Sequence, residues 1–145
     1  MNKKELAYLA GIVDGEGTIS VTSDKASGCL FATYLSIANT SCKLLETIKK
    51  WVGAGCIQPK KGAKVYYKTC YVYTLRGDTL RKLLPELVPF LVVKKEQAKL
   101  LIKLMSLTGK HLKFYKQLHP EMFSRCQEIA VLLHSLNKKA TKKEK

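Results

Sequence analysis

The first apolar pattern in the chain has a period of three to four residues, which predicts a helix near the N-terminus. Its apolar face consists of Leu6, Leu9, Ala10 and Val13. On a neighbouring face two small residues, Ala7 and Gly11, stand one helical turn apart. Because neither carries a bulky side chain, we expect this face to allow close approach of another backbone.

The apolar helix is followed by Asp14, Gly15, Glu16 and Gly17. We expect the glycines to end the helix after Val13 in left-handed geometry, which leaves Glu16 just beyond the last carbonyls. The C-terminal end of a helix is already negative, so a carboxylate at this place needs a compensating cation. These residues predict either a metal site or an ordinary core helix closed by a glycine-rich turn with two solvated acids.

After residue 17 the apolar period changes to two, which is typical of half-buried strands. The alternation predicts a strand over residues 18–24 and a second one over 29–39, joined as a hairpin. The outer face of the first strand carries only hydrogen-bonding side chains. They are Thr18, Ser20, Thr22 and Asp24.

A second strand pair is predicted over residues 56–60 and 65–75, around a turn at 61–64. In the later strand either the tyrosine set or the set with Cys70 and Val72 can face outward, and we favour the tyrosine set. Aromatic side chains beside lysines form a wet recognition surface, although tyrosines also occupy strands on propensity alone. The residues expected to face outward are Tyr67, Thr69, Tyr71 and Tyr73.

Helical patterns separate and follow the strand pairs. The first of these helices begins at a Thr40 or Ser41 cap and ends at Gly53. Three more are predicted, one that begins at 77–78, one over 94–109 and one that begins at 119–120. The order of helix, two strands, helix, two strands and further helices predicts one α+β domain over residues 1–137. Residues 138–145 form a basic, apolar-poor tail that we expect to be disordered.

The net charge of the chain indicates a polyanionic partner. Its 145 residues include 26 Lys and Arg against 11 Asp and Glu, giving a net charge of +15 and a pI of about 9.7. Nucleic acid is the first candidate. We expect no membrane partner, since there is neither a basic amphipathic helix nor an apolar run of about 18 residues. The five cysteines form no C-x-x-C pair, and the N-terminus shows no targeting signal.

Residues 9–17 closely resemble the LAGLIDADG motif of homing endonucleases. The motif letters are matched by Leu9, Ala10, Gly11, Asp14 and Gly17. Gly15 replaces alanine and Glu16 replaces the second aspartate, for which glutamate is an accepted variant. The resemblance implies a single LAGLIDADG-type α+β domain of helix-hairpin-helix-hairpin-helices order. Its four strands would form a curved antiparallel sheet that binds DNA in the major groove.

The resemblance also implies the chemistry of the site. Glu16, with the backbone carbonyl of Gly15, would hold Mg²⁺, and two or more divalent ions would be shared at a dimer axis. Catalytic roles are implied for Glu16, Asn39 and Lys94. Asn39 replaces the more usual glutamine, and Lys95 is the alternative to Lys94 if the register slips by one residue.

The implied DNA contacts lie on the strands and their turns, where polar side chains would read base edges and lysines would contact phosphates. The alternative is a solvated sheet face. The residues are Ser20, Thr22, Asp24, Tyr34, Ser36, Gln58, Lys60, Lys61, Lys64, Tyr67, Thr69, Tyr71 and Tyr73. The implied dimer interface consists of Ala7, Ala10, Gly11 and Asp14.

Because the chain carries one motif, a single Glu16 supplies half of the ligands needed to cut two DNA strands. We therefore expect a homodimeric, intron-encoded homing endonuclease that cuts a long, near-palindromic site by metal-dependent phosphodiester hydrolysis. The alternatives are a maturase of the same fold that binds intron RNA and a noncatalytic DNA-binding regulator. The expected location is a chloroplast or mitochondrion if the protein is organelle-encoded, and otherwise the prokaryotic cytoplasm.

Overall fold

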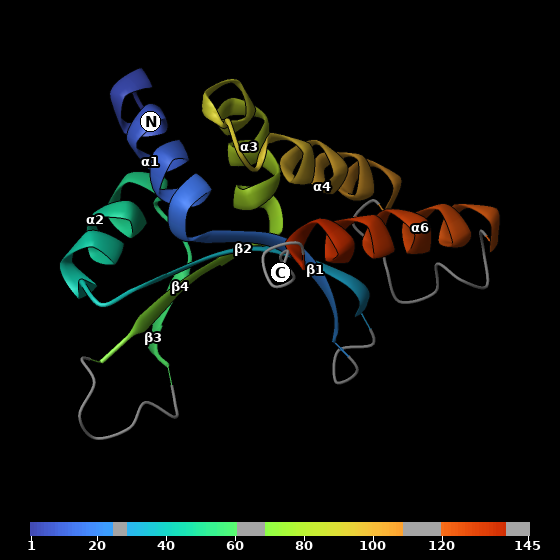
Figure 1. The fold of residues 1–145 in the computed structure, drawn as a ribbon, viewed down its shortest axis with the longest axis horizontal. Coiled ribbons are helices and arrows are strands. Elements are labelled where there is room, and N and C mark those ends of the chain that lie inside the picture. The colour runs from blue at the N-terminus through green and yellow to red at the C-terminus, as the bar shows by residue number, and fades with distance from the viewer. Residues whose placement is uncertain (25–28, 61–68, 109–119, 139–145) are drawn as a thin grey trace, which may run out of the picture.

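The computed structural model describes residues 1–24, 29–60, 69–108 and 120–138, with the backbone alone at 23–24 and 29–30. Its elements follow the expected order, and the α+β class is confirmed (Figure 1). They are α1 (Lys3–Glu16), β1 (Gly17–Asp24), β2 (Cys29–Asn39), α2 (Cys42–Val52), β3 (Cys56–Pro59), β4 (Tyr71–Arg76), α3 (Gly77–Leu87), the 3-10 helix η1 (Val88–Phe90), α4 (Lys95–Thr108) and α6 (Pro120–Asn137). None of the described helices is long and apolar enough to cross a membrane.

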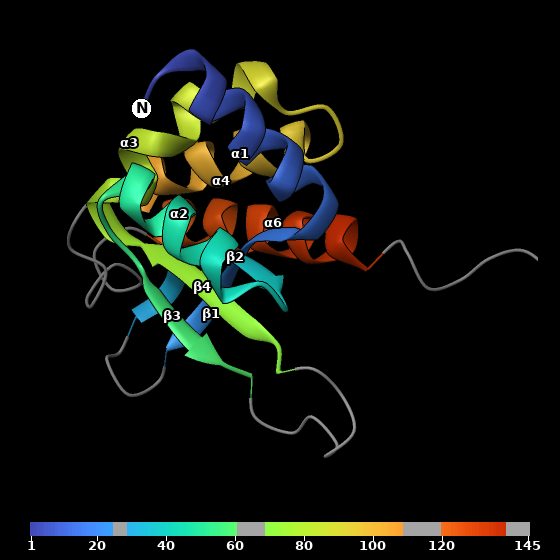
Figure 2. The ribbon, with the colours of Figure 1, turned by 90° about the vertical axis from the view of Figure 1, so that its left-hand side faces the viewer.

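The four strands form one antiparallel sheet, as predicted, and their order is β1-β2-β4-β3. Gly17 of β1 lies opposite Ile37 of β2, and Ile37 lies opposite Tyr73 of β4. Figure 1 shows the sheet as an arch whose two hairpins point away from the helices, and Figure 2 shows the helices gathered on one side of it. We call the side turned away from the helices the open face of the sheet.

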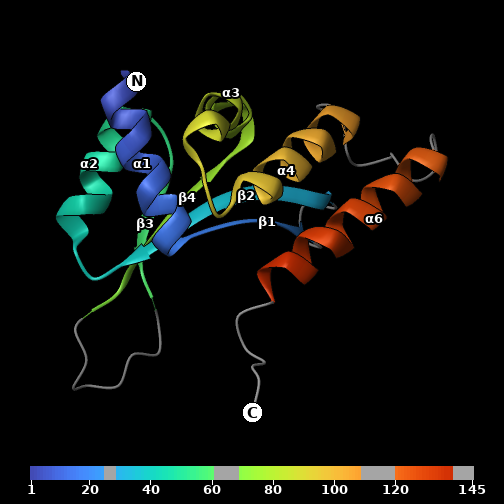
Figure 3. The same cartoon turned by 45° about the horizontal axis from the view of Figure 1, so that its top comes forward.

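The core lies between the sheet and the helical layer. The period of two in the strands directs Ile19, Leu35 and Ile37 into this layer, and each is 0% exposed. Helix α1 contributes an apolar stripe whose members are three to four residues apart. Leu9 and Val13 of this stripe are also 0% exposed. Packing of this stripe fixes α1 above the sheet, so that its C-terminal end lies directly at the start of β1 (Figure 3).

Helix α2 begins and ends at the residues that the sequence indicated. The Ser41 hydroxyl accepts a hydrogen bond from the backbone N–H of Leu44 at 3.3 Å, which makes Ser41 rather than Thr40 the N-cap. Gly53 closes the helix with a φ of 76°, the left-handed conformation that glycine adopts without a Cβ penalty.

The prediction for the end of α1 was wrong. The helix continues through Gly15 to Glu16, and Gly17 has an extended backbone with a φ of −80°. Gly17 is required for another reason: a Cβ there would lie 2.7 Å from the backbone oxygen of Val13. The chain turns from the helix into β1 so closely that only a residue without a side chain fits.

The described bounds of the second strand pair differ from the predicted ones. Strand β3 ends at Pro59, and β4 begins at Tyr71 and continues to Arg76. Residues 69–70 are described but belong to no strand, and 61–68 lie outside the described residues. Of the predicted tail 138–145, only Lys138 is described, as the turn that follows α6.

Candidate functional site

Glu16 and Asn39 come together at the junction of α1 and the sheet. The side-chain Nδ2 of Asn39 donates a hydrogen bond to Oε2 of Glu16 at 3.2 Å, while its Oδ1 accepts one from the backbone N–H of Ser41. The strand register explains this meeting, because Gly17 lies opposite Ile37, two residues before Asn39. Glu16 is exposed. The arrangement holds an accessible carboxylate in a defined orientation where α1 passes into β1.

Asp14 and Lys94 form a reciprocal clamp between α1 and the segment that precedes α4. The Asp14 carboxylate accepts hydrogen bonds from the backbone N–H groups of Val92 and Lys94, each at 2.8 Å. In return, Nζ of Lys94 donates to the backbone oxygens of Val13 at 2.9 Å and of Asp14 at 2.6 Å. The ammonium group thus compensates the negative end of α1, a role for which the sequence indicated a cation. Lys94, and not Lys95, lies at this end of the helix.

The clamp shifts the pKa values of both partners. Partial burial of Asp14 opposes its charged form, but hydrogen bonds from the backbone amides of Val92, Lys94 and Val93 outweigh it and lower the pKa of the carboxyl. Partial burial lowers the pKa of Lys94, and the adjacent Asp14 carboxylate counteracts part of this effect. Asp14 is therefore held as a carboxylate that organises backbone, and it offers little to a metal ion.

The solvent-exposed side of α1 carries two small residues, Ala7 and Gly11, one helical turn apart. Ala7 and Gly11 are exposed, and a Cβ added at Gly11 would meet no atom within 4 Å. Val92 and Val93, which the clamp fixes beside the end of α1, are 83% and 69% exposed. The expectation for Ala10 was wrong: it is 0% exposed because it belongs to the buried stripe of the helix.

Two cross-strand rows on the open face of the sheet consist of polar side chains. In one row Thr18 lies opposite Ser36, which lies opposite Thr74. In the next row Ser20, Tyr34 and Arg76 follow one another across β1, β2 and β4. Opposed residues of adjacent strands point to the same side, so these rows turn away from the helices. Gln58 and Thr22 share this face, and Lys60 is exposed directly after β3.

Three of the expected DNA contacts are corrected by the structure. Tyr73 lies opposite Ile37 on the core side and is 0% exposed; its hydroxyl donates to the backbone oxygen of Ala54 at 2.8 Å. Burial, with a smaller contribution from Cys56, raises the pKa of Tyr73 to about 12. Tyr71 has the same parity in β4 and therefore also points away from the open face.

The third correction concerns Ser20, which lies on the open face but is only 3% exposed, so its hydroxyl offers almost no surface. Thr69 is exposed but precedes β4 and pairs with no strand. The side chain of Asp24 and the whole of Lys61, Lys64 and Tyr67 lie outside the described residues.

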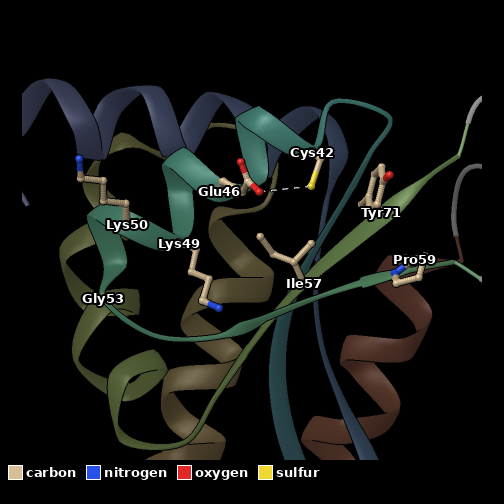
Figure 4. A pocket seen from close by; sticks show the side chains of 8 residues that line it. All are labelled: Cys42, Glu46, Lys49, Lys50, Gly53, Ile57, Pro59 and Tyr71. Carbon is tan, nitrogen blue, oxygen red and sulfur yellow. Dashed lines mark hydrogen bonds between the residues drawn. The ribbon is translucent and has the colours of Figure 1, made fainter.

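Tyr71 lines a pocket between α2 and the β3-β4 edge of the sheet (Figure 4). This pocket has a volume of about 590 Å³, with Ile57 at its floor and Cys42 and Glu46 on the helix. The Cys42 thiol donates a long hydrogen bond of 3.8 Å to Glu46, and partial burial, together with the Glu46 charge, raises its pKa. The pocket opens on the helical side of the sheet. Asn39, the partner of Glu16, lies directly opposite Tyr71 in the strand register, so these two side chains point to the same side.

The sequence patterns missed Arg76 and Thr74 as open-face residues. Arg76 was assigned to the connection before the third helix, whereas it ends β4. Continuing the period of two from Val72 through Thr74 would have placed both side chains on the same face. The choice of the tyrosine set as the outward one prevented this reading.

No protein-family model and no curated protein matches this sequence, whereas solved structures match its fold. The homing endonuclease I-CvuI in complex with the I-CreI target has a TM-score of 0.77 at 22% identity, covering 97% of this chain and 87% of that chain. An archaeal intron-encoded homing endonuclease complexed with DNA has a TM-score of 0.74 at 25% identity, covering 98% and 89%. The LAGLIDADG meganuclease I-AabMI bound to uncleaved DNA has a TM-score of 0.63 at 21% identity, covering 89% of this chain and 43% of that chain.

These features define a class of α+β protein. In it, a helix that ends in a carboxylate residue leads into a sheet whose open face carries polar side chains. This is the fold of the LAGLIDADG homing endonucleases, and the resemblance carried by residues 9–17 is confirmed.

Proposed function

We propose that this protein is a site-specific DNA endonuclease that hydrolyses both strands of duplex DNA as a homodimer. The observation that carries this proposal is the position of Glu16, whose exposed carboxylate is held by Asn39 where α1 passes into β1, the first strand of the sheet. An acid that could serve hydrolysis and a surface that could read bases thus belong to one continuous segment. The DNA-bound structures that share this fold support the same conclusion.

The residues at the end of α1 fit a divalent metal ion. Mg²⁺ prefers oxygen ligands, binds through one or two carboxylates and keeps several waters. Glu16 provides a carboxylate with one oxygen, Oε1, outside the bond to Asn39, and the Gly15 carbonyl is a second candidate ligand. When bound, Mg²⁺ would supply an activated water and stabilise the leaving oxygen. Asn39 would orient the carboxylate, and Lys94 would neutralise the adjacent helix end.

The homodimer follows from the outward side of α1. One chain supplies one Glu16, so two copies are needed to act on two strands. Ala7 and Gly11 leave room for a second α1, while the exposed Val92 and Val93 provide apolar surface beside it. A two-fold axis through this contact would bring two Glu16 side chains together and match a near-palindromic site.

The net charge of +15 should make binding to DNA strongly dependent on salt. If the dimer neutralises about 6–10 phosphates, affinity should fall by roughly 10³- to 10⁵-fold between about 50 and 200 mM salt. A nearly flat dependence would contradict this account of the charge. Stronger binding to structured intron RNA than to any selected duplex would favour the maturase.

The test of the chemistry is Glu16→Gln. Sequences that wild-type protein cuts are first selected from randomised duplexes in Mg²⁺, and both proteins are then assayed for binding and cleavage of a selected site. Glutamine keeps the size and the contact to Asn39 but removes the charge, so we expect binding to persist and cleavage to be lost. Glu86→Gln, an exposed acid on α3, is the matched control and should cut normally.

Two outcomes of this assay would overturn the role of Glu16. Cleavage by Glu16→Gln at a near wild-type rate would show that it is not the metal ligand. Equal loss of binding and cleavage would indicate a structural role. A wild-type protein that selects duplexes in binding but cuts none in Mg²⁺ would be the noncatalytic regulator.

A further inference from the structure

One row of the open face differs from the others because it carries a charge. Arg76 lies directly opposite Tyr34, and its guanidinium carbon is 5.5 Å from the centre of the Tyr34 ring. This distance is within the range of a cation–π contact. Among the strand residues whose side chains the structure describes, Arg76 is the only charged one on the open face.

The guanidinium of Arg76 is held over the ring of Tyr34, and among the described residues nothing else engages it. Arg76 is exposed, and within the described part of the chain no hydrogen bond or ion pair engages its side chain. A planar guanidinium has five N–H donors in a rigid fork, and contact with an aromatic ring leaves these donors at its edge. The contact with Tyr34 therefore reduces the rotamer freedom that Arg76 would lose on binding a partner.

The position of this pair favours a base over a phosphate. Arg76 ends β4 two residues beyond Thr74, the last residue paired with β3, but its guanidinium lies over the ring of Tyr34 in β2, an inner strand. The guanidinium is therefore turned across the sheet and not outward from it. Their row includes Ser20, three residues after Gly17, about 10 Å along β1 at roughly 3.4 Å per residue. The row thus stands a few base pairs from the place where Glu16 would act.

We propose that Arg76, positioned by the ring of Tyr34, determines specificity by binding the O6 and N7 acceptors of a guanine in the major groove of each half-site. This inference rests on the proposed function, since it requires duplex DNA on the open face. The bidentate arginine–guanine pair is the commonest specific contact in the major groove and discriminates by about 1–3 kcal/mol, which corresponds to about 5- to 150-fold.

The test is a binding selection from randomised duplexes in Ca²⁺, followed by affinity measurements on the wild-type consensus. We expect wild type to select guanine at one position of each half-site. Arg76→Ala should lose that preference alone and bind the consensus about 5- to 150-fold more weakly. Arg76→Lys keeps the charge without the fork, so it should also relax this position. Tyr34→Ala should weaken the same preference, while Tyr34→Phe, which keeps the ring, should retain it.

Lys49→Ala is the matched control, because it removes one positive charge from an exposed site on α2 and should leave the consensus unchanged. Thermal unfolding of each variant shows whether it is folded. An Arg76→Ala protein that loses affinity equally for all duplexes, with a salt slope reduced by about 1, would make Arg76 a phosphate contact and overturn the inference. An unchanged consensus would overturn it as well. A wild type that selects no sequence at all would instead refute the proposed function.

Discussion

Replacing Asp14 by asparagine tests the clamp that fixes the segment before α4 to the end of α1. The carboxylate accepts two backbone hydrogen bonds of 2.8 Å, from Val92 and from Lys94. Asparagine has one oxygen to accept one of them, and it turns an NH₂ group toward the other N–H. The substitution also removes the negative charge beside the Lys94 ammonium, while side-chain size stays the same.

The magnitude follows from the bonds that are lost. A hydrogen bond to a charged group contributes about 1.5–3 kcal/mol. The backbone N–H that faces the asparagine NH₂ is left without an acceptor, which adds a part of the desolvation penalty of that N–H. Since Asp14 is only partly buried, we expect Asp14→Asn to lower the free energy of unfolding by about 2–3 kcal/mol. For a domain of this size, this corresponds to a fall in Tm of roughly 6–10 °C.

The pH dependence of this difference identifies the carboxylate as its source. The pKa of Asp14 is lowered in the folded protein below its ordinary value of 3.8, so ionised Asp14 stabilises the fold at pH values above that. This contribution is lost as the pH falls through the lowered pKa. The gap between wild type and Asp14→Asn should therefore be constant near neutral pH and shrink below about pH 4.

The assay is urea unfolding followed by circular dichroism in metal-free buffer, from neutral pH downward. Asp78→Asn, the same change at an exposed acid in the first turn of α3, is the control and should cost less than about 1 kcal/mol. If Asp14→Asn unfolds with the wild-type midpoint, or if its deficit is as large in acid as at neutral pH, the clamp does not stabilise the fold in the way that its geometry indicates.

Three further substitutions and one control, Gly15→Ala, separate packing from function. Gly17→Ala should cost about 1–3 kcal/mol in urea unfolding because its Cβ meets a backbone oxygen at 2.7 Å, while Gly15→Ala, with no atom within 4 Å, should not destabilise. Tyr73→Phe removes the hydroxyl that donates to the part-buried carbonyl of Ala54, so it should lower stability by about 1–2 kcal/mol yet leave DNA affinity unchanged; a selective loss of affinity would contradict its assignment to the core. Gly11→Leu should keep the monomer fold but shift sedimentation toward monomer, and a fully dimeric variant would refute the contact through α1.

Local patterns in the sequence were sufficient for much of the fold. The period of two gave the bounds of β2 as residues 29–39, and Ser41 and Gly53 marked the ends of α2 because capping and left-handed closure depend on near neighbours. The nine residues 9–17 identified the fold family, since their residue types are specific in that order. The class of partner followed from the net charge, which needs no knowledge of the fold.

Tertiary structure decided what local patterns left open. The predicted strand 65–75 offered two outward faces, one with Cys70 and Val72 and one with the tyrosines, and pairing of β4 with β2 and β3 shows that Tyr73 belongs to the core. The helix around Gly15 continues because Lys94, far along the chain, supplies the positive charge that its end requires. Ala10 and Gly11 are adjacent in sequence, yet the rotation of α1 on the sheet buries one and exposes the other. These are long-range contacts, and no short stretch of sequence contains both of their partners.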